Sequence, residues 1–251
     1  MGYRPILVCL TSILLACFGA SAKDSRNQAD RPAWFWTPPA TDQSDCVVGM
    51  CQPCLDRDAS HEEARDKALE LLAVMRGARI RSRTGLVGID ESVRHMGTDI
   101  EAVYDSTLPA SLSESYDELA SFTDGDLVAV LVGPRDDSGK IDEIGKYEPP
   151  DCWWQHVPSD DSCLYAVGEA PQFQYEVSSW RLALKRAMLE LAGQVRVSIS
   201  SLRKTDGERY GKVVLQEGDV RIRNWQIVAR HYDVDLQVYY VLLRMPRENA
   251  S

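Results

Sequence analysis

The sequence lacks both an excess of basic residues and any long hydrophobic run beyond its N-terminus. Its 28 Lys and Arg face 38 Asp and Glu, a formal net charge of -10, whereas a general nucleic-acid binder carries the opposite balance. No stretch after Ala22 is apolar enough to span a bilayer. A Gly-x-Ser-x-Gly elbow, a Walker loop and a His-Glu-x-x-His pair are also missing, which excludes the usual nucleophile, phosphate and zinc-protease motifs.

What remains is ordinary globular composition. The 251 residues are 44% hydrophobic and 26% charged, which argues against a disordered or collagen-like chain. This length suits one large domain or two small ones.

The N-terminus has the pattern of a secretory signal peptide, predicted over 1–22. A basic start, Met1 to Arg4, precedes an apolar run, 5–20, and small residues that end at Ala22. Two processing sites are open. Cleavage after Ala22 leaves a soluble chain, whereas Leu14-Leu15-Ala16-Cys17 fits a bacterial lipobox that makes Cys17 the lipidated first residue.

Export to an oxidising compartment predicts disulfides. The mature chain holds five candidates, Cys46, Cys51, Cys54, Cys152 and Cys163. Cys152 and Cys163 flank a short loop and are expected to pair. The other three form one bridge in any of three ways and leave one thiol over.

Cys51-Gln52-Pro53-Cys54 has the spacing of a redox pair, which needs a helix N-terminus beside it to lower a thiol pKa. The helix is expected to begin only at Ser60, so a structural disulfide is favoured. A zinc site built from these cysteines with Cys46 and His61 has enough ligands, but its spacing matches no common finger. We therefore predict no catalytic residue, metal ligand or cofactor.

The chain contains one unit twice. Residues 31–82 align without a gap with 150–201, and a later part aligns at a shorter offset, as if the second copy were shortened after its second strand. Two copies are too few for a solenoid and indicate a tandem duplication. We expect a first module at 31–133, a linker at 134–149 and a second module at 150–247. The matching pairs include Trp34/Trp153, Gly49/Gly168, Ser60/Ser179, Ala64/Ala183, Ala68/Ala187, Ala120/Ala229, Asp124/Asp233 and Asp126/Asp235.

Each copy predicts a strand, a helix and three further strands, an α+β fold with a mostly antiparallel sheet. The first helix is expected to start with a capping box, Ser60 to Glu63. Apolar residues recur at helical spacing in both copies. The last two strands of the second copy are expected at 220–228 and 236–245, joined as a hairpin. The two helical stripes are Ala64, Ala68, Leu71, Leu72 and Met75, and Trp180, Ala183, Leu184, Ala187 and Leu191.

The second copy resembles a known family. Leu164-Tyr165-Ala166-Val167-Gly168-Glu169-Ala170, the alanine-lined helix and the Val/Ile-alternating strand after it look like the bacterial Lpp-twenty lipoprotein family. That domain is also similar to the N-terminal domain of the flagellar assembly protein T. The resemblance implies an exported envelope lipoprotein, some members being tied to flagella, and favours lipid attachment at Cys17. It carries no active site.

Two further sets of residues are candidates for binding. Trp34, Trp36, Trp153 and Trp154 could hold a glycan or a partner protein, although recurrence of a Trp in both copies favours packing. The repeated aspartates, Asp124 and Asp126 with Asp233 and Asp235, are explained by turn chemistry.

The predicted function is a non-enzymatic module for assembly or scaffolding, anchored to the outer membrane and facing the periplasm, with a possible flagellar association. Expected partners are envelope proteins or further copies of the chain, because an acidic first part and a mildly basic second part could stack head to tail. Peptidoglycan is a further candidate partner, and nucleic acid is not one. The alternatives are a periplasmic thiol-disulfide protein using Cys51 and Cys54, and a glycan- or peptidoglycan-binding module.

Overall fold

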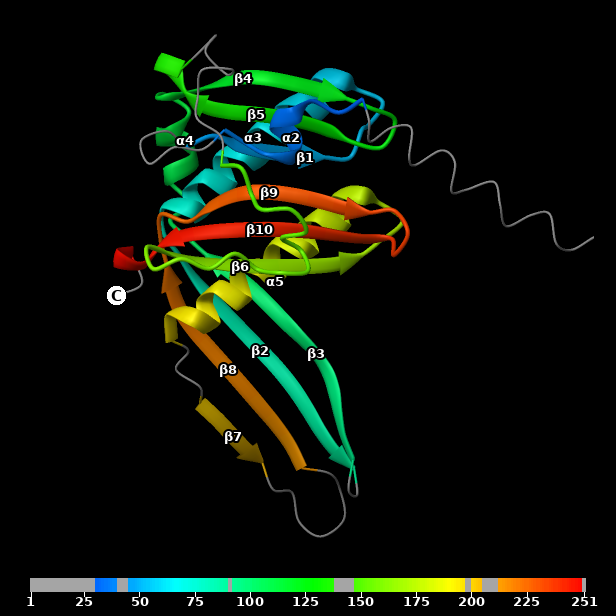
Figure 1. Cartoon of the computed structure of the whole chain (residues 1–251), viewed down its shortest axis with the longest axis vertical. Helices are drawn as coiled ribbons and strands as arrows, with labels where there is room; N and C mark the ends of the chain where they lie inside the picture. Colours follow the sequence, from blue (N-terminus) through cyan, green and yellow to red (C-terminus); the bar gives the residue numbers. More distant parts are fainter. Residues whose placement is uncertain are drawn as a thin grey trace, which may run out of the picture. The chain divides into compact units, whose positions relative to one another are not determined.

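A computed structural model describes residues 30–39, 45–89, 92–137, 147–196, 200–204 and 212–249. The predicted signal peptide and Cys17 lie outside these ranges. Residues Pro32–Ser251 form one compact unit of helices and antiparallel sheets (Figure 1), which confirms the predicted α+β class. In the described part, no helix is both long and apolar enough to cross a membrane.

The elements of the chain fall into two series that share one order, a strand, a helix and further strands, with the short helices α2 and α4 present, among the described residues, only in the first (Figure 1). The first series is α2 (Ala33–Trp36), β1 (Val47–Cys51), α3 (Arg57–Arg76), β2 (Ala78–Ile89), β3 (Ser92–Val103), α4 (Leu108–Leu112), β4 (Tyr116–Thr123) and β5 (Val128–Pro134). The second is β6 (Cys163–Pro171), α5 (Glu176–Arg196), β7 (Ser200–Lys204), β8 (Lys212–Ile222), β9 (Gln226–Asp233) and β10 (Val238–Pro246). We call the two series the first and second halves.

Each half has a three-stranded antiparallel sheet with the same strand order, β1-β5-β4 in the first and β6-β10-β9 in the second. The sequence predicts one strand, a helix and three further strands in each copy, and each half of the structure contains one strand more than this. The run predicted as a single strand at 220–228 is divided between β8 and β9, because Asn224 has a left-handed φ of 53° that ends the extended backbone.

Helices α3 and α5 lie unusually close to their sheets at Gly49 and Gly168. A Cβ on Gly49 would stand 2.0 Å from the carbonyl oxygen of Ala64, and a Cβ on Gly168 would stand 2.0 Å from that of Ala183. Only glycine permits such an approach of strand to helix backbone. The aligned glycines and alanines therefore fix the same packing in both halves.

Smaller features recur as well. Ser60 and Ser179 are buried, and each Oγ accepts a 2.9 Å hydrogen bond from the backbone of the preceding loop. Leu119 in β4 and Val228 in β9 are the extra residues at a β-bulge in their pairings with β5 and β10. The alignment places these two residues opposite each other, so both halves share the same irregularity.

The halves are joined by a third sheet, of order β3-β2-β8-β7. Strand β2 pairs with β8 from Ala78 opposite Ile222 to Gly88 opposite Lys212. One cluster of buried side chains also runs through both halves. The expected modules at 31–133 and 150–247 are thus parts of one compact unit. Helix α4 stands between β3 and β4 with no counterpart before β9, so the second half is shortened after its third strand and not after its second.

The predicted capping box is wrong. Helix α3 begins at Arg57, and the cap is Asp56, whose Oδ1 accepts from the amides of Asp58 and Ala59 at 3.0 and 3.2 Å. A carboxylate at this position satisfies amides that lack an intrahelical partner. Ser60 instead lies buried inside the first turns of the helix.

Of the expected linker at 134–149, residues 138–146 lie outside the described ranges. The segment that follows lies on the outer face of β6-β10-β9, where Tyr147, Trp153 and Trp154 pack against a second, smaller cluster of buried side chains. Asp160 stabilises this segment, because its carboxylate accepts hydrogen bonds from the Cys163 amide (2.6 Å) and the Tyr165 hydroxyl (2.7 Å). These bonds hold the pKa of Asp160 well below its usual range.

Candidate functional site

Four loops lie at one end of the two sheets, at the right of Figure 1. They are 52–56 and 124–127 in the first half, and 172–175 and 234–237 in the second. The Gln172 amide donates to the Gln237 carbonyl at 2.9 Å within the second half. Arg181 of α5 donates to the Met50 carbonyl at 3.3 Å, which brings the end of β1 to the start of α5. We call these four loops the loop end.

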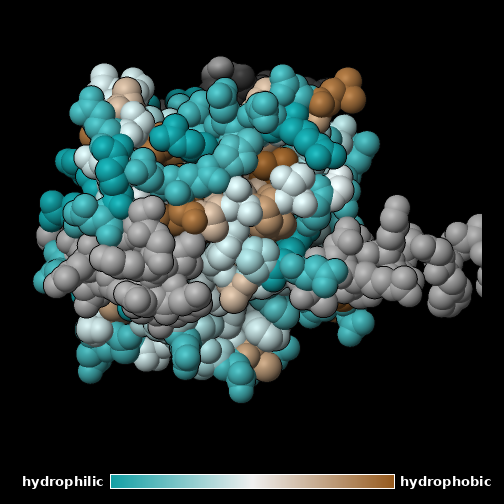
Figure 2. All heavy atoms as spheres, turned by 90° about the horizontal axis from the view of Figure 1, so that it is seen from above, coloured by the Kyte–Doolittle hydropathy of each residue, from teal (hydrophilic) through white to brown (hydrophobic). Residues whose placement is uncertain are grey.

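The loop end carries most of the exposed large hydrophobic side chains in the described part of the chain. On the face shown in Figure 2, hydrophilic side chains dominate and the hydrophobic ones form small separate patches. Apolar groups gathered on one surface mark interaction sites more often than scattered ones do. Four of the five such side chains are Leu55, Phe173, Tyr175 and Leu236, and the fifth is Val157.

The repeated aspartates lie at the loop end and shape its turns. The Asp126 amide donates to Asp124 Oδ1 at 2.9 Å, and the amides of Asp235 and Leu236 donate to Asp233 Oδ1 at 3.0 and 2.9 Å. This is the turn chemistry favoured from the sequence.

Cys51 and Cys54 flank the start of loop 52–56, but their environments differ. Cys51 is buried, and its Sγ donates to the Ser60 carbonyl at 2.9 Å. Burial, with smaller contributions from Glu63 and Cys54, raises the pKa of the Cys51 thiol. A redox-active pair needs a thiol of lowered pKa, so this environment disfavours thiol-disulfide catalysis.

We predict that iodoacetamide at pH 8 alkylates Cys54, which is exposed, at least about tenfold faster than Cys51, because only an accessible thiolate reacts. Peptide mass spectrometry over a time course measures both rates. In the Cys54→Ser variant the alkylation of Cys51 should remain slow. In denaturant, Cys51 and Cys54 of the wild type should be alkylated at similar rates. Equal rates in the folded protein would contradict the assigned burial of Cys51.

No disulfide joins any two of the five described cysteines in the structure. The expected Cys152–Cys163 pair is not formed, and the backbone of each cysteine makes its own local hydrogen bonds. Cys152 lies in a turn with a φ of 57°, and its carbonyl accepts from the amides of Gln155 and His156. Cys163 is the first residue of β6, and its backbone amide donates a hydrogen bond to the carboxylate of Asp160.

The described residues include no group of three or more His, Cys, Asp or Glu placed to hold a metal ion. The zinc site considered with Cys46, Cys51 and Cys54 is therefore not assembled. His61 instead lies 3.1 Å from Glu118, from Nε2 to Oε1.

Two of the four candidate binding tryptophans are buried. Trp34 is 8% exposed and Trp153 4%, which removes them from a binding surface. Trp36 and Trp154 are partly buried, and Trp154 stacks on His231 with ring centroids 3.6 Å apart. These contacts agree with the packing interpretation favoured from the sequence.

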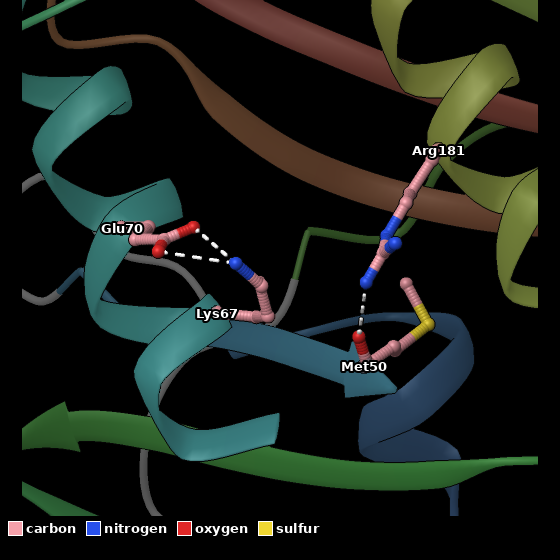
Figure 3. Close-up of polar contacts among 4 residues, drawn as sticks. All are labelled: Met50, Lys67, Glu70 and Arg181. Atoms are coloured by element: carbon pink, nitrogen blue, oxygen red, sulfur yellow. Dashed lines mark hydrogen bonds and ion pairs between the residues drawn. The ribbon is translucent and has the colours of Figure 1, made fainter. Parts of the chain in front are cut away.

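A pocket of about 190 Å³ lies at the boundary of the halves. We call it the seam pocket. At its edge Lys67 holds Glu70 through two contacts of 2.9 and 3.1 Å, and Arg181 reaches across from α5 to Met50 (Figure 3). Its apolar lining includes Val48, Leu71, Val74, Trp180, Leu184 and Val241.

Arg230 of β9 also lines the seam pocket. It stands opposite Val241 in the strand pairing, so both side chains point to the pocket face of the sheet. Arg230 is 4% exposed; its Nη1 donates to the Phe35 carbonyl at 2.9 Å, and its Nη2 has no hydrogen-bond partner. Burial lowers the pKa of Arg230 to about 9, which leaves the guanidinium charged at neutral pH.

Sequence reasoning missed Arg230. The available signal was a single charged residue within the apolar strand Ile227-Val228-Ala229-Arg230, where the aligned residue of the first half is Ser121. A charge at an inward strand position is rare unless it is paired.

Comparison with protein-family models, with curated proteins and with solved structures found no match to this chain.

Proposed function

We propose that the chain is a non-enzymatic, exported envelope protein that acts as an assembly or scaffolding module and binds its partner through the loop end. The observation that carries this proposal is the gathering of exposed Leu55, Phe173, Tyr175 and Leu236 on equivalent loops of both halves. Apolar and aromatic side chains at the centre of a contact, surrounded by polar ones, are typical of protein interfaces.

The fusion of the halves supports the same proposal. A shared sheet and a shared buried cluster hold the loops of the two halves in a fixed relation. A surface that is already ordered loses little conformational entropy when a partner binds. Two similar loop pairs, 52–56 with 124–127 and 172–175 with 234–237, therefore offer one extended contact surface.

The test replaces Leu55, Phe173, Tyr175 and Leu236 together by serine in the full chain. Chemical cross-linking in intact cell envelopes should recover at least about tenfold less cross-linked partner than with the wild type, because a few residues at the centre of an interface supply most of its binding energy. The matched control is Val157→Ser, which removes the one exposed large hydrophobic side chain that the described residues hold outside the loop end. Equal recovery from the fourfold variant and the control would refute the proposal, provided that both unfold at the wild-type temperature.

The envelope location and the lipid at Cys17 belong to this proposal and rest on the sequence pattern at 1–22 and on the family resemblance. Mass spectrometry of the mature N-terminus distinguishes a lipidated Cys17 from a free Lys23. A flagellar association is part of the same proposal, and the identity of the cross-linked partner tests it.

A further inference from the structure

We propose that the seam pocket is a binding site for a small carboxylate with a short apolar tail, and that Arg230 binds the carboxylate. The inference concerns a site separate from the loop end and does not depend on it.

The buried charge of Arg230 indicates an anionic ligand. In folded proteins a buried charge is paired or hydrogen-bonded throughout, because an uncompensated ion in a low-dielectric interior is costly. Within the described residues no carboxylate forms an ion pair with Arg230; its guanidinium lies over the Phe35 ring, 5.6 Å from the centroid, and its Nη2 has no hydrogen-bond partner. A carboxylate bound beside Arg230 in the pocket would supply the opposite charge.

The other charged side chains that line the pocket are mostly positive, as Arg230 is. Lys67 and Arg181 line the pocket as well, and among its described lining residues Glu70 is the one with an acidic side chain. Glu70 already accepts both contacts from Lys67. A pocket of positive charge in a chain of net charge -10 favours an anionic ligand over a neutral or cationic one.

The size and lining of the pocket define the rest of the ligand. An apolar cavity of about 150 Å³ holds a benzene molecule, so about 190 Å³ admits one ring or a short alkyl chain. Trp180 and Leu184 from α5 and Val48 from β1 supply apolar walls. Ligand sites commonly combine such walls with one or two polar groups that fix orientation.

The test uses hexanoate as the probe and hexanamide as its uncharged counterpart. Both are titrated into the full chain while the indole resonance of Trp180, which lines the pocket, is followed by NMR. We expect hexanoate to bind with a Kd at least about tenfold lower than hexanamide, because a charge-assisted contact is stronger than a neutral one. The Arg230→Met variant should bind hexanoate with a Kd at least about tenfold higher than the wild type, while its Kd for hexanamide should change less than about twofold.

Arg186→Met is the matched control. Arg186 is an exposed arginine of α5 that bonds the Glu169 carbonyl and does not line the pocket, so its loss should leave hexanoate binding unchanged. Similar affinities of the wild type for hexanoate and hexanamide would overturn the proposal. So would wild-type affinity for hexanoate in a folded Arg230→Met variant, or an equal loss of hexanoate affinity in Arg230→Met and Arg186→Met. The fourfold loop-end variant should still bind hexanoate, which separates this site from the proposed partner surface.

Discussion

The Gly168→Ala variant should lose about 3 kcal/mol or more of its free energy of unfolding. The new methyl carbon would stand 2.0 Å from the Ala183 carbonyl oxygen and 2.2 Å from the Ala187 nitrogen. Both atoms are helix backbone, so α5 as a whole must move away from β6 to accept it. Overpacking of this kind costs about 1–3 kcal/mol when only side chains yield, and movement of a helix costs more because it also opens the contacts beside it.

Urea denaturation measures this loss. Gly49→Ala should be destabilised to a similar degree, because its Cβ would meet the Ala64 oxygen and the Ala68 nitrogen at 2.0 and 2.3 Å. The control is Gly193→Ala in α5, where the added carbon meets no atom within 4 Å. Alanine there should raise stability by about 0.5–1 kcal/mol, since glycine is a poor helix former. A Gly168→Ala variant as stable as the wild type would contradict the close approach.

These glycines show what the sequence could predict. The gapless alignment of 31–82 with 150–201 pairs Gly49 with Gly168 and each following alanine with its equivalent. Such pairing predicts equivalent packing, because small residues recur where helix and strand backbones approach. The helical stripes, the closing hairpins and the turn aspartates were predicted for the same reason: each depends on residues close together in sequence.

What the sequence could not supply depends on distant residues. The pairing of β2 with β8 joins strands from different halves, and neither strand contains a local signal for its neighbour. The start of α3 was misplaced because Ser60 to Glu63 fits a capping pattern, yet Asp56 binds the first amides and Ser60 is buried instead. The seam pocket was missed because it draws on both halves at once.

Arg230→Met should be more stable than the wild type without ligand, by about 1–4 kcal/mol, the range of gains found when a buried ion pair is replaced by apolar residues of similar volume. Methionine can pack against Phe35, over whose ring the Arg230 guanidinium lies, without a charge to desolvate. The variant loses the hydrogen bond from Nη1 to the Phe35 carbonyl and the cation–π contact with the Phe35 ring. The first contributes about 0.5–1.5 kcal/mol and the second about 0.5–2 kcal/mol. Removal of the unpaired charge is the larger effect.

Thermal and urea unfolding of Arg230→Met measure this gain, with Arg186→Met as the control. Arg186 is exposed, so its replacement should change stability by no more than about 0.5 kcal/mol. If only Arg230→Met gains stability, the Arg230 side chain destabilises the protein without ligand. Residues kept for binding often have this effect. A loss of about 2 kcal/mol or more would instead make Arg230 an anchor for α2 through Phe35, and the carboxylate site would lose its main physical argument.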